Sequence, residues 1–313
     1  MQENQTVIQE LFIMGFQVSH GYKILLFVLF LSVYVITIAG NLLIISLVAT
    51  CSQLFYPMYF YLSNLSVCEI LLTTNISPYM IHLLLVDKSP VSVARCFLQF
   101  YFFGTSATTE CFLLAVMSYD RYLAICNPLR YSSIMDEKRC HDLALCVWVI
   151  GLSATVGTIV LLCKLEFCGP NVIDHFFCDR EPILKLSCSD TIMVRAQALV
   201  FSFIITLFPF AVILWSYASI ILTILRMPTA VVRKKAFSTC SSHLMVVSMY
   251  YGTLIIMYVV PTNGQRFNAN KLLSLLYTVV TPLLNPIIYS FRNQEIKGSL
   301  NEALRRIFCP EKY

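Results

Sequence analysis

Two acidic residues stand inside long apolar stretches, where an ionised side chain is costly. Glu69 and Glu110 each lie near the middle of such a stretch. An ionisable residue inside a membrane span is a functional-site hypothesis, and two adjacent carboxylates cannot both ionise cheaply. Together with Asn41 and Asn285 they supply the hard oxygen ligands that predict a site for Na⁺ or a proton. The alternative is two neutral acids hydrogen-bonded within a packed core.

Two further charged pairs could support chemistry. Asp120 and Arg121 end the apolar stretch that contains Glu110. The carboxylate can hold the guanidinium until a partner's helix takes it, or the Arg can simply extend to lipid headgroups. Asp174 and His175 lie in a polar loop without a second His nearby, which favours a surface pair over a metal site. No catalytic Ser-His-Asp constellation, phosphate-binding loop or metal-ligand cluster appears in the sequence, so we do not expect an enzyme.

The elements that hold these residues are membrane-spanning helices. Of the 313 residues, 58% are hydrophobic and only 12% are charged, against about 25% charged in a soluble domain. This composition excludes a soluble domain and a disordered chain, and no basic run large enough to bind nucleic acid occurs. A spanning helix needs about 20 mostly apolar residues. Seven stretches qualify, at residues 24–49, 58–86, 97–125, 143–163, 196–225, 243–260 and 272–291. We predict an all-α membrane protein, a seven-transmembrane helix bundle.

Charges in the connecting segments predict its orientation. Lys and Arg are in moderate excess on the side that also holds the C-terminus, as expected for cytoplasmic segments. Asn4 begins the glycosylation sequon Asn-Gln-Thr, which is usable only on the opposite side. We therefore expect a plasma-membrane protein with an extracellular N-terminus at residues 1–23, a receptor-type bundle at 24–291 and a cytoplasmic tail at 292–313.

The tail should form an additional short helix. Ile296, Leu300, Leu304 and Ile307 recur at helical spacing, with basic residues on other faces, which is typical of an amphipathic helix on a membrane surface. Cys309 follows this helix and is a candidate for palmitoylation.

The outer segments contain four cysteines. Cys96, Cys168, Cys178 and Cys188 all lie on the expected extracellular side, where oxidising conditions favour disulfides. Four cysteines permit three pairings, and the residues alone do not choose among them. We expect at least one bridge to tie the long loop after the fourth span to Cys96. Such a loop would cover a cavity in the bundle.

Several motifs together resemble one family. They are Met-Ser-Tyr-Asp-Arg-Tyr at residues 117–122, Lys-Ala-Phe-Ser-Thr-Cys at 235–240 and Pro-Leu-Leu-Asn-Pro-Ile-Ile-Tyr at 282–289. With them, nearly the whole chain resembles vertebrate olfactory receptors of the tetrapod-type branch, which are rhodopsin-like (class A) G-protein-coupled receptors. The departures are small: Ser118 stands where the family has Ala, and Glu69 where most members have Asp.

The resemblance implies specific pairings and roles. It pairs Cys96 with Cys178 and Cys168 with Cys188. It also implies coupling to a stimulatory, olfactory-type G protein that raises cAMP. The residues expected to serve coupling and activation are Asp120, Arg121, Tyr217, Lys235, Asn285, Pro286 and Tyr289.

By the same resemblance, an odorant cavity should lie among the outer halves of the third, fifth, sixth and seventh helices. The spacing of Phe103, Gly104, Ala107 and Thr108 places them on one face of the third helix, and no acid occurs on that face. The expected partners across the cavity are Phe201, Ser202, Ile205, Tyr251, Leu254, Ile255, Tyr258 and Thr278. A mostly apolar site with a few hydroxyls suits a small, mostly neutral volatile molecule bound at micromolar order.

Two other functions share some of these features. Another class A receptor, for a lipid or a peptide, would have the same architecture. A proton-coupled transporter could use Glu69 and Glu110 as a relay, but the two halves of the chain show no internal repeat of the kind common in transporters. We expect membrane lipids around the bundle, no nucleic-acid partner and no cofactor apart from the candidate Na⁺.

Overall fold

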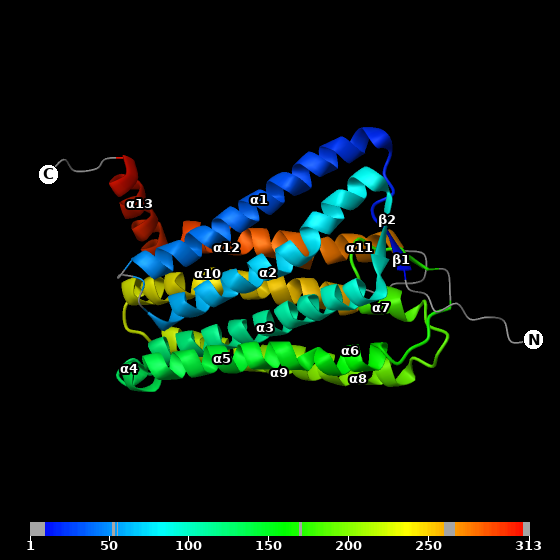
Figure 1. The fold of residues 1–313 in the computed structure, drawn as a ribbon. Helices are drawn as coiled ribbons and strands as arrows, with labels where there is room; N and C mark the ends of the chain where they lie inside the picture. Colours follow the sequence, from blue (N-terminus) through cyan, green and yellow to red (C-terminus); the bar gives the residue numbers. More distant parts are fainter. Residues whose placement is uncertain (1–9, 52–53, 55, 169–170, 260–266, 309–313) are drawn as a thin grey trace, which may run out of the picture.

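The computed structural model describes residues 10–51, 54, 56–168, 171–259 and 267–308 of the chain. These residues form seven long helical rods (Figure 1). The first three rods are α1 (His20–Thr50), α2 (Pro57–Val86) and α3 (Val93–Cys126). The fourth consists of α5 (Glu137–Ala154) and α6 (Val156–Leu162), and the fifth of α8 (Ile192–Ser202), the π-helical turn η2 (Phe203–Leu207) and α9 (Phe208–Leu225). The sixth is α10 (Ala230–Val259), and the seventh consists of α11 (Phe267–Leu275), the π-helical turn η3 (Leu276–Val280) and α12 (Thr281–Arg292).

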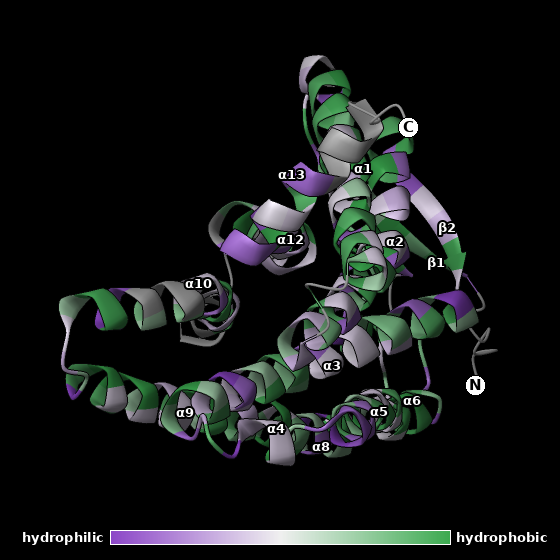
Figure 2. Cartoon of the chain, turned by 90° about the vertical axis from the view of Figure 1, so that its left-hand side faces the viewer, coloured by the Kyte–Doolittle hydropathy of each residue, from purple (hydrophilic) through white to green (hydrophobic). Residues whose placement is uncertain are grey.

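The rods agree with the predicted spans. Within the described residues, six of them are long and apolar enough to cross a membrane, while the described part of α10 does not meet that criterion by itself. The apolar side chains cover much of the outer surface of the bundle, as the green ribbon along α1 and α9 shows in Figure 2. Such a surface is stable only in lipid.

Local sequence sets where several helices begin. Pro57 occupies the first turn of α2, where its missing N–H costs nothing. Ser92 caps α3 by accepting a hydrogen bond from the backbone N–H of Arg95 at 3.3 Å, and Asp136 caps α5 in the same way.

Proline also explains the two π-helical turns. Each turn lies directly before a proline in the first turn of the next helix, Pro209 in α9 and Pro282 in α12. A proline cannot donate to the preceding turn and clashes with its carbonyl, so the turn before it widens. In η3 the carbonyl of Leu276 accepts hydrogen bonds from both the backbone N–H and the hydroxyl of Thr281, the latter at 3.0 Å.

A small sheet covers one end of the bundle, which we call the sheet end. Its strands are β1 (Glu10–Met14), β2 (Lys88–Ser92) and β3 (Val172–Ile173), in the order β2-β1-β3. Strand β1 runs antiparallel to β2 and parallel to β3, with Phe12 opposite Val172. This sheet was not predicted from the sequence, because five residues are too short for a clear alternation of apolar and polar side chains. Leu11 and Ile13 nevertheless face inward and are fully buried.

Helix α13 (Gln294–Phe308) lies at the opposite end, which we call the α13 end (Figure 1). This is the predicted additional helix, and Ile296 is buried against the bundle. The hydroxyl of Tyr59 on α2 donates to Glu295 at 2.5 Å and so ties α13 to the second rod. Cys309 lies outside the described residues. A short helix, α4 (Tyr131–Ile134), also lies at this end.

The buried core has two parts. At the sheet end, Phe176 and Phe177 pack with β1, α2 and α3. The other cluster includes Leu62, Met117 and Tyr289 and joins the rods towards the α13 end.

Candidate functional site

A cavity of about 480 Å³ lies inside the bundle near the sheet end. It is bounded by α3, by the Thr155–Thr158 segment of the fourth rod, by the α8–η2 segment, and by α10 and the seventh rod. This volume is within the range of pockets that bind small molecules. The apolar and hydroxyl-bearing residues of its wall include Phe103, Gly104, Ala107, Thr108, Thr155, Thr158, Phe201, Ser202, Ile205, Thr206, Tyr250, Leu254, Ser274 and Tyr277.

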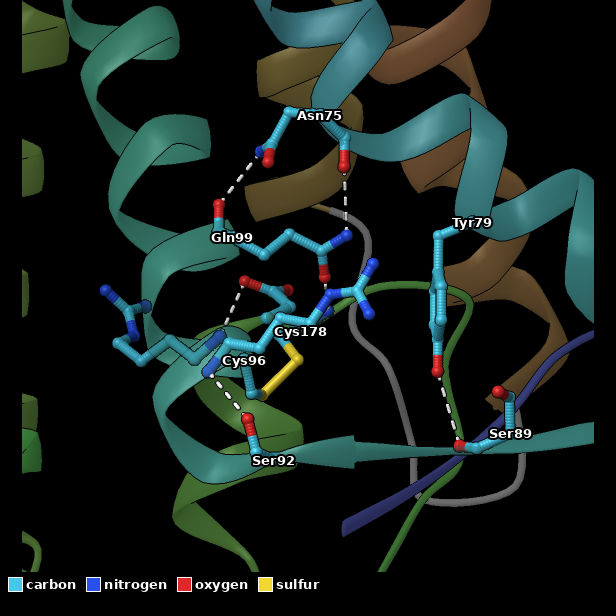
Figure 3. Close-up of a disulfide and its surroundings, with 10 residues drawn as sticks. Asn75, Tyr79, Ser89, Ser92, Cys96, Gln99 and Cys178 are labelled. Atoms are coloured by element: carbon cyan, nitrogen blue, oxygen red, sulfur yellow. Dashed lines mark hydrogen bonds between the residues drawn. A yellow bond between two sulfur atoms is a disulfide. The ribbon is translucent and has the colours of Figure 1, made fainter. Parts of the chain in front are cut away.

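The loop after α6 lines one end of the cavity and is held by two disulfides. One joins Cys96 in the first turn of α3 to Cys178, with Cα atoms 5.4 Å apart, and the other joins Cys168 to Cys188. These are the pairs that the resemblance implies. Beside the first bridge, the side-chain oxygen of Gln99 accepts a hydrogen bond from the backbone N–H of Cys178 at 2.9 Å (Figure 3). The loop is therefore fixed to α3 both covalently and by hydrogen bonding.

Gln99 is in turn fixed to α2. Its amide nitrogen donates to the carbonyl of Asn75 at 3.0 Å, and the amide nitrogen of Asn75 donates to the carbonyl of Gln99 at 2.9 Å (Figure 3). This reciprocal pair holds the second and third rods in register beneath the loop.

The loop end of the cavity is charged, and several of these charges form ion pairs. Lys271 in α11 donates to Asp174 at 2.5 Å and to the carbonyl of Gly15 at 3.1 Å, so one cation joins the seventh rod, the loop and the N-terminal segment. Glu181, in the short helix α7 (Arg180–Leu184), pairs with Arg195 at 2.8 Å and with Arg180.

Burial changes the acid–base behaviour of two loop residues. His175 is 4% exposed, and burial together with the positive charge of Lys271 lowers its pKa to about 3. His175 is therefore neutral at physiological pH. Burial also raises the pKa of Asp179, although the backbone N–H of Arg180 donates to its carboxylate and opposes that change.

Glu69 and Glu110 lie deeper in the bundle and are both buried. Glu69 accepts a hydrogen bond from the amide of Asn285, while Asn41 donates to the carbonyls of Thr37 and Pro282. Glu110 also lines the floor of the cavity. Within the described part of the chain, one oxygen each of Glu69, Glu110 and Asn285 has no hydrogen-bond partner. Buried oxygens without partners are suited to a cation or a shared proton.

At the α13 end, Arg121 is held by its neighbour. Its guanidinium donates to the Asp120 carboxylate at 2.5 Å, and the hydroxyl of Tyr131 donates to the other oxygen of Asp120 at 2.8 Å. This is the charge pairing considered from the sequence. Nearby, the hydroxyl of Tyr217 lies 2.6 Å from Nδ1 of His243, joining α9 to α10.

The comparisons with known proteins agree along the whole chain. The family model described as olfactory receptor matches residues 30–308. Olfactory receptor 10A7 of Homo sapiens is 45% identical over 302 residues, which cover 96% of each chain. Olfactory receptor 5G25 of Mus musculus is 45% identical over 309 residues, covering 99% of this chain and 97% of its own. The chain belongs to the olfactory receptor family.

Membership fixes the class of the protein. It is an odorant receptor of the G-protein-coupled type and a multi-pass protein of the plasma membrane, and its family is not enzymatic. The predictions of family, fold class and non-enzymatic function are thereby confirmed.

In this receptor, most of the expected ligand-binding residues line the cavity. Phe103, Gly104, Ala107, Thr108, Phe201, Ser202, Ile205 and Leu254 all do so. Two expected residues do not. Tyr251 is 3% exposed and stacks on Phe210, with ring centroids 4.7 Å apart, while Thr278 is fully buried and donates to the carbonyl of Ser274 at 2.7 Å.

The remaining expected residues are placed as follows. Asn285, Pro286 and Tyr289 are buried in α12. Lys235, Ile255 and Tyr258 lie on α10, but their side chains are outside the described part of the receptor, and so is the whole of Asn4.

Three features of the cavity were missed or misplaced from the sequence. Glu110 lines the cavity although it does not lie on the face of α3 that was predicted to do so. Its position two residues after Thr108 places it off the predicted face, so the spacing along α3 did not identify it. The loop residues Asp174 to Lys185 form the charged end, and the fourth rod contributes Thr155 and Thr158. The spacing of these two threonines, three residues apart at the break between α5 and α6, is the signal that could have identified them.

Proposed function

We propose that the receptor binds a small, mostly neutral volatile molecule in this cavity. The observation that carries the proposal is a cavity of about 480 Å³ whose walls within the bundle are mostly apolar, with a few hydroxyls and Glu110, and at whose charged end Glu181 and Asp174 are held in ion pairs. A ligand with a net charge would have to break those pairs or bring its own counter-ion. A neutral molecule with one polar group needs neither.

A single hydrogen bond would orient that ligand. Thr108 and Ser202 face the cavity from α3 and α8, and both are candidates for this contact. A molecule of this size makes few contacts, so its affinity is limited, and half-maximal responses fall at micromolar order.

The sheet end faces the outside of the cell and the α13 end faces the cytoplasm. Both disulfides lie at the sheet end, and disulfides persist in the oxidising environment outside the cell. The glycosylation sequon at Asn4 precedes β1, which belongs to the same end. The excess of basic residues in the opposite segments supports the same orientation.

Signalling proceeds by a shift between two conformations. A bound odorant favours the one in which the α13 end opens, and it shifts the equilibrium only by its difference in affinity for the two states. Arg121 leaves Asp120, and Tyr217, Tyr289 and the start of α10 around Lys235 rearrange. A stimulatory G protein of the olfactory type then binds and raises cAMP.

The acid pair supports a cation or proton site. Glu69 and Glu110, with Asn285, provide three buried oxygens without hydrogen-bond partners in the described part of the chain. These hard ligands suit Na⁺ or a shared proton. If Na⁺ binds, replacing NaCl by N-methyl-D-glucamine chloride changes the thermal stability of the receptor but not that of Glu69→Gln. A proton site shows no such salt effect.

The function is tested in transfected cells. Cells expressing the receptor at the plasma membrane should raise cAMP in response to some members of a panel of neutral volatiles. Arg121→Ala at equal surface expression should abolish the response. A response confined to peptides, or one that persists in Arg121→Ala, would refute the proposal.

A further inference from the structure

A second cavity, of about 580 Å³, lies on the flank of the bundle at the sheet end. It is formed by α2, the first turns of α3 and strand β2. None of the residues that line it lines the odorant cavity. The second cavity is therefore separate from the odorant cavity.

The rim of this cavity carries a cation without an acidic partner. The guanidinium of Arg95 lies over the ring of Tyr79, with its central carbon 5.9 Å from the ring centroid. The ring of His82 follows, 6.3 Å from that of Tyr79. Among the described residues, Arg95 forms no ion pair. An arginine placed over an aromatic ring and open to a cavity is suited to binding phosphate.

The floor of the cavity offers no comparable group. Asn75 and Gln99 line it, but each amide nitrogen donates to the other residue's carbonyl, and the side-chain oxygen of Gln99 accepts from Cys178 (Figure 3). The hydroxyl of Tyr79 donates to the carbonyl of Ser89 at 3.3 Å. Asn75 Nδ2, the Gln99 amide and the Tyr79 hydroxyl therefore have partners, and Arg95 is the one Lys, Arg, Asp or Glu among the described residues that line the cavity.

Exposed apolar side chains follow Arg95 along the outer face of α3, in the direction of the α13 end. Leu98 and Phe102 follow Arg95 at the spacing of one face of α3, and their side chains are 54% and 42% exposed. Arg95 lies in the first turn of α3, just before the predicted apolar span that begins at residue 97, where lipid headgroups are expected. A cation at the headgroup level above an exposed apolar stripe matches the two halves of a phospholipid.

We propose that this cavity binds a membrane phospholipid, with the phosphate on Arg95 and an acyl chain along Leu98 and Phe102. The arginine requires an anion and the stripe requires a hydrocarbon chain, and a phospholipid supplies both. A sterol supplies only a hydroxyl above its rings, and a free phosphate leaves the stripe uncovered.

The test counts the lipids retained by the purified receptor in detergent, by native mass spectrometry. Phosphatidylglycerol, diacylglycerol with the same acyl chains, cholesterol and inorganic phosphate are added separately. We expect phosphatidylglycerol to be retained at least five-fold more than diacylglycerol or cholesterol, and inorganic phosphate not to displace it. Equal retention of diacylglycerol, preferential retention of cholesterol, or displacement by inorganic phosphate would each overturn the proposal.

A matched pair of variants locates the site. Arg95→Gln should reduce the retention of phosphatidylglycerol about five-fold, while Lys164→Gln, which removes an exposed cation at the same end but outside the cavity, should leave it unchanged. Equal retention by Arg95→Gln and the unaltered receptor would place the lipid elsewhere and refute the proposal. If Arg95→Gln does not fold, the comparison of lipids on the unaltered receptor still decides.

Discussion

The side chain of Lys271 reaches from the seventh rod to Asp174 in the loop over the cavity, with Nζ 2.5 Å from the carboxylate oxygen. The two partners differ in exposure: the Lys271 side chain is 5% exposed and that of Asp174 is 46% exposed. The pair is therefore a buried cation held by a half-exposed anion, and the two single substitutions should not be equivalent.

Removing the anion should cost more than removing the cation. Asp174→Ala leaves a buried charge without its partner and should destabilise the receptor by about 3 kcal/mol. Lys271→Met leaves only a carboxylate that water can reach, and should cost about 1 kcal/mol or less. Thermal unfolding in detergent measures both. The double variant should resemble Lys271→Met, and equal losses in the two single variants would contradict this account.

Acid should weaken the loop through His175. Its pKa is about 3 in the folded receptor, against 6.5 for an ordinary histidine. Between these values the unfolded chain binds a proton that the folded chain does not, so the free energy of unfolding falls as the pH falls from 6.5 towards 3. The loss is at most about 1.4 kcal/mol per pH unit, and stability is insensitive to this group above pH 6.5.

The pH effect is measured as the melting temperature at pH 7.5, 6.5, 5.5 and 4.5. His175→Gln, which cannot take up the proton, serves as the control and should lose less stability between pH 6.5 and 4.5. Parallel curves for the two proteins would show that His175 does not titrate in this way.

Release of Arg121 should raise basal signalling. In Asp120→Asn the guanidinium of Arg121 loses its charged partner on α3 and becomes available to a G protein. We expect basal cAMP to rise several-fold at equal surface expression. Tyr131→Phe removes only the hydroxyl that donates to Asp120 and should have a smaller effect in the same direction. Basal cAMP that is unchanged in Asp120→Asn would argue against a restraining role of this pair.

Filling the cavity should shift the range of ligands. Ala107 lines the wall, so Ala107→Leu reduces the space available to an odorant. Responses to the larger active volatiles should weaken at least ten-fold, while smaller ones keep their potency. Ala218→Leu makes the same change on an exposed face of α9 and should alter neither. An equal loss for large and small ligands would indicate a general defect rather than a smaller cavity.

Close packing between the third and fourth rods depends on Gly151. A Cβ atom at this position would collide with the hydroxyl of Thr109 and lie 3.0 Å from the carbonyl of Thr105. Gly151→Ala should therefore cost about 1–3 kcal/mol in thermal unfolding. Thr109→Ala added to it should restore most of the loss. Gly252→Ala, where nothing lies within 4 Å, should be neutral or slightly stabilising.

The sequence predicted the rods well because lipid imposes a simple requirement. A helix that crosses a membrane must be apolar over about 20 residues, and this is visible one segment at a time. The face of α3 around Ala107 could be predicted for a related reason, since residues at helical spacing share a face whatever surrounds them.

Features that depend on several elements together were not predictable in this way. The rotation of α10 decides that Leu254 lines the cavity while Tyr251 turns to Phe210, and no local pattern fixes that rotation. Glu110 also lines the cavity, although it lies off the predicted face of α3. The disulfide pairs followed only from the resemblance, because four cysteines alone leave three pairings open.

The position of strand β1 between β2 and β3 has a consequence for biogenesis. Its two partners belong to segments that the ribosome makes later, and β3 follows only after the fourth rod. Until then, Leu11 and Ile13 have no complete apolar surface to pack against, and one edge of the strand lacks its neighbour. Strand β1 is therefore synthesised early but reaches its final place late. Protection of β1 from proteases or antibodies would distinguish nascent receptors that have completed the loop from those that have stalled before it.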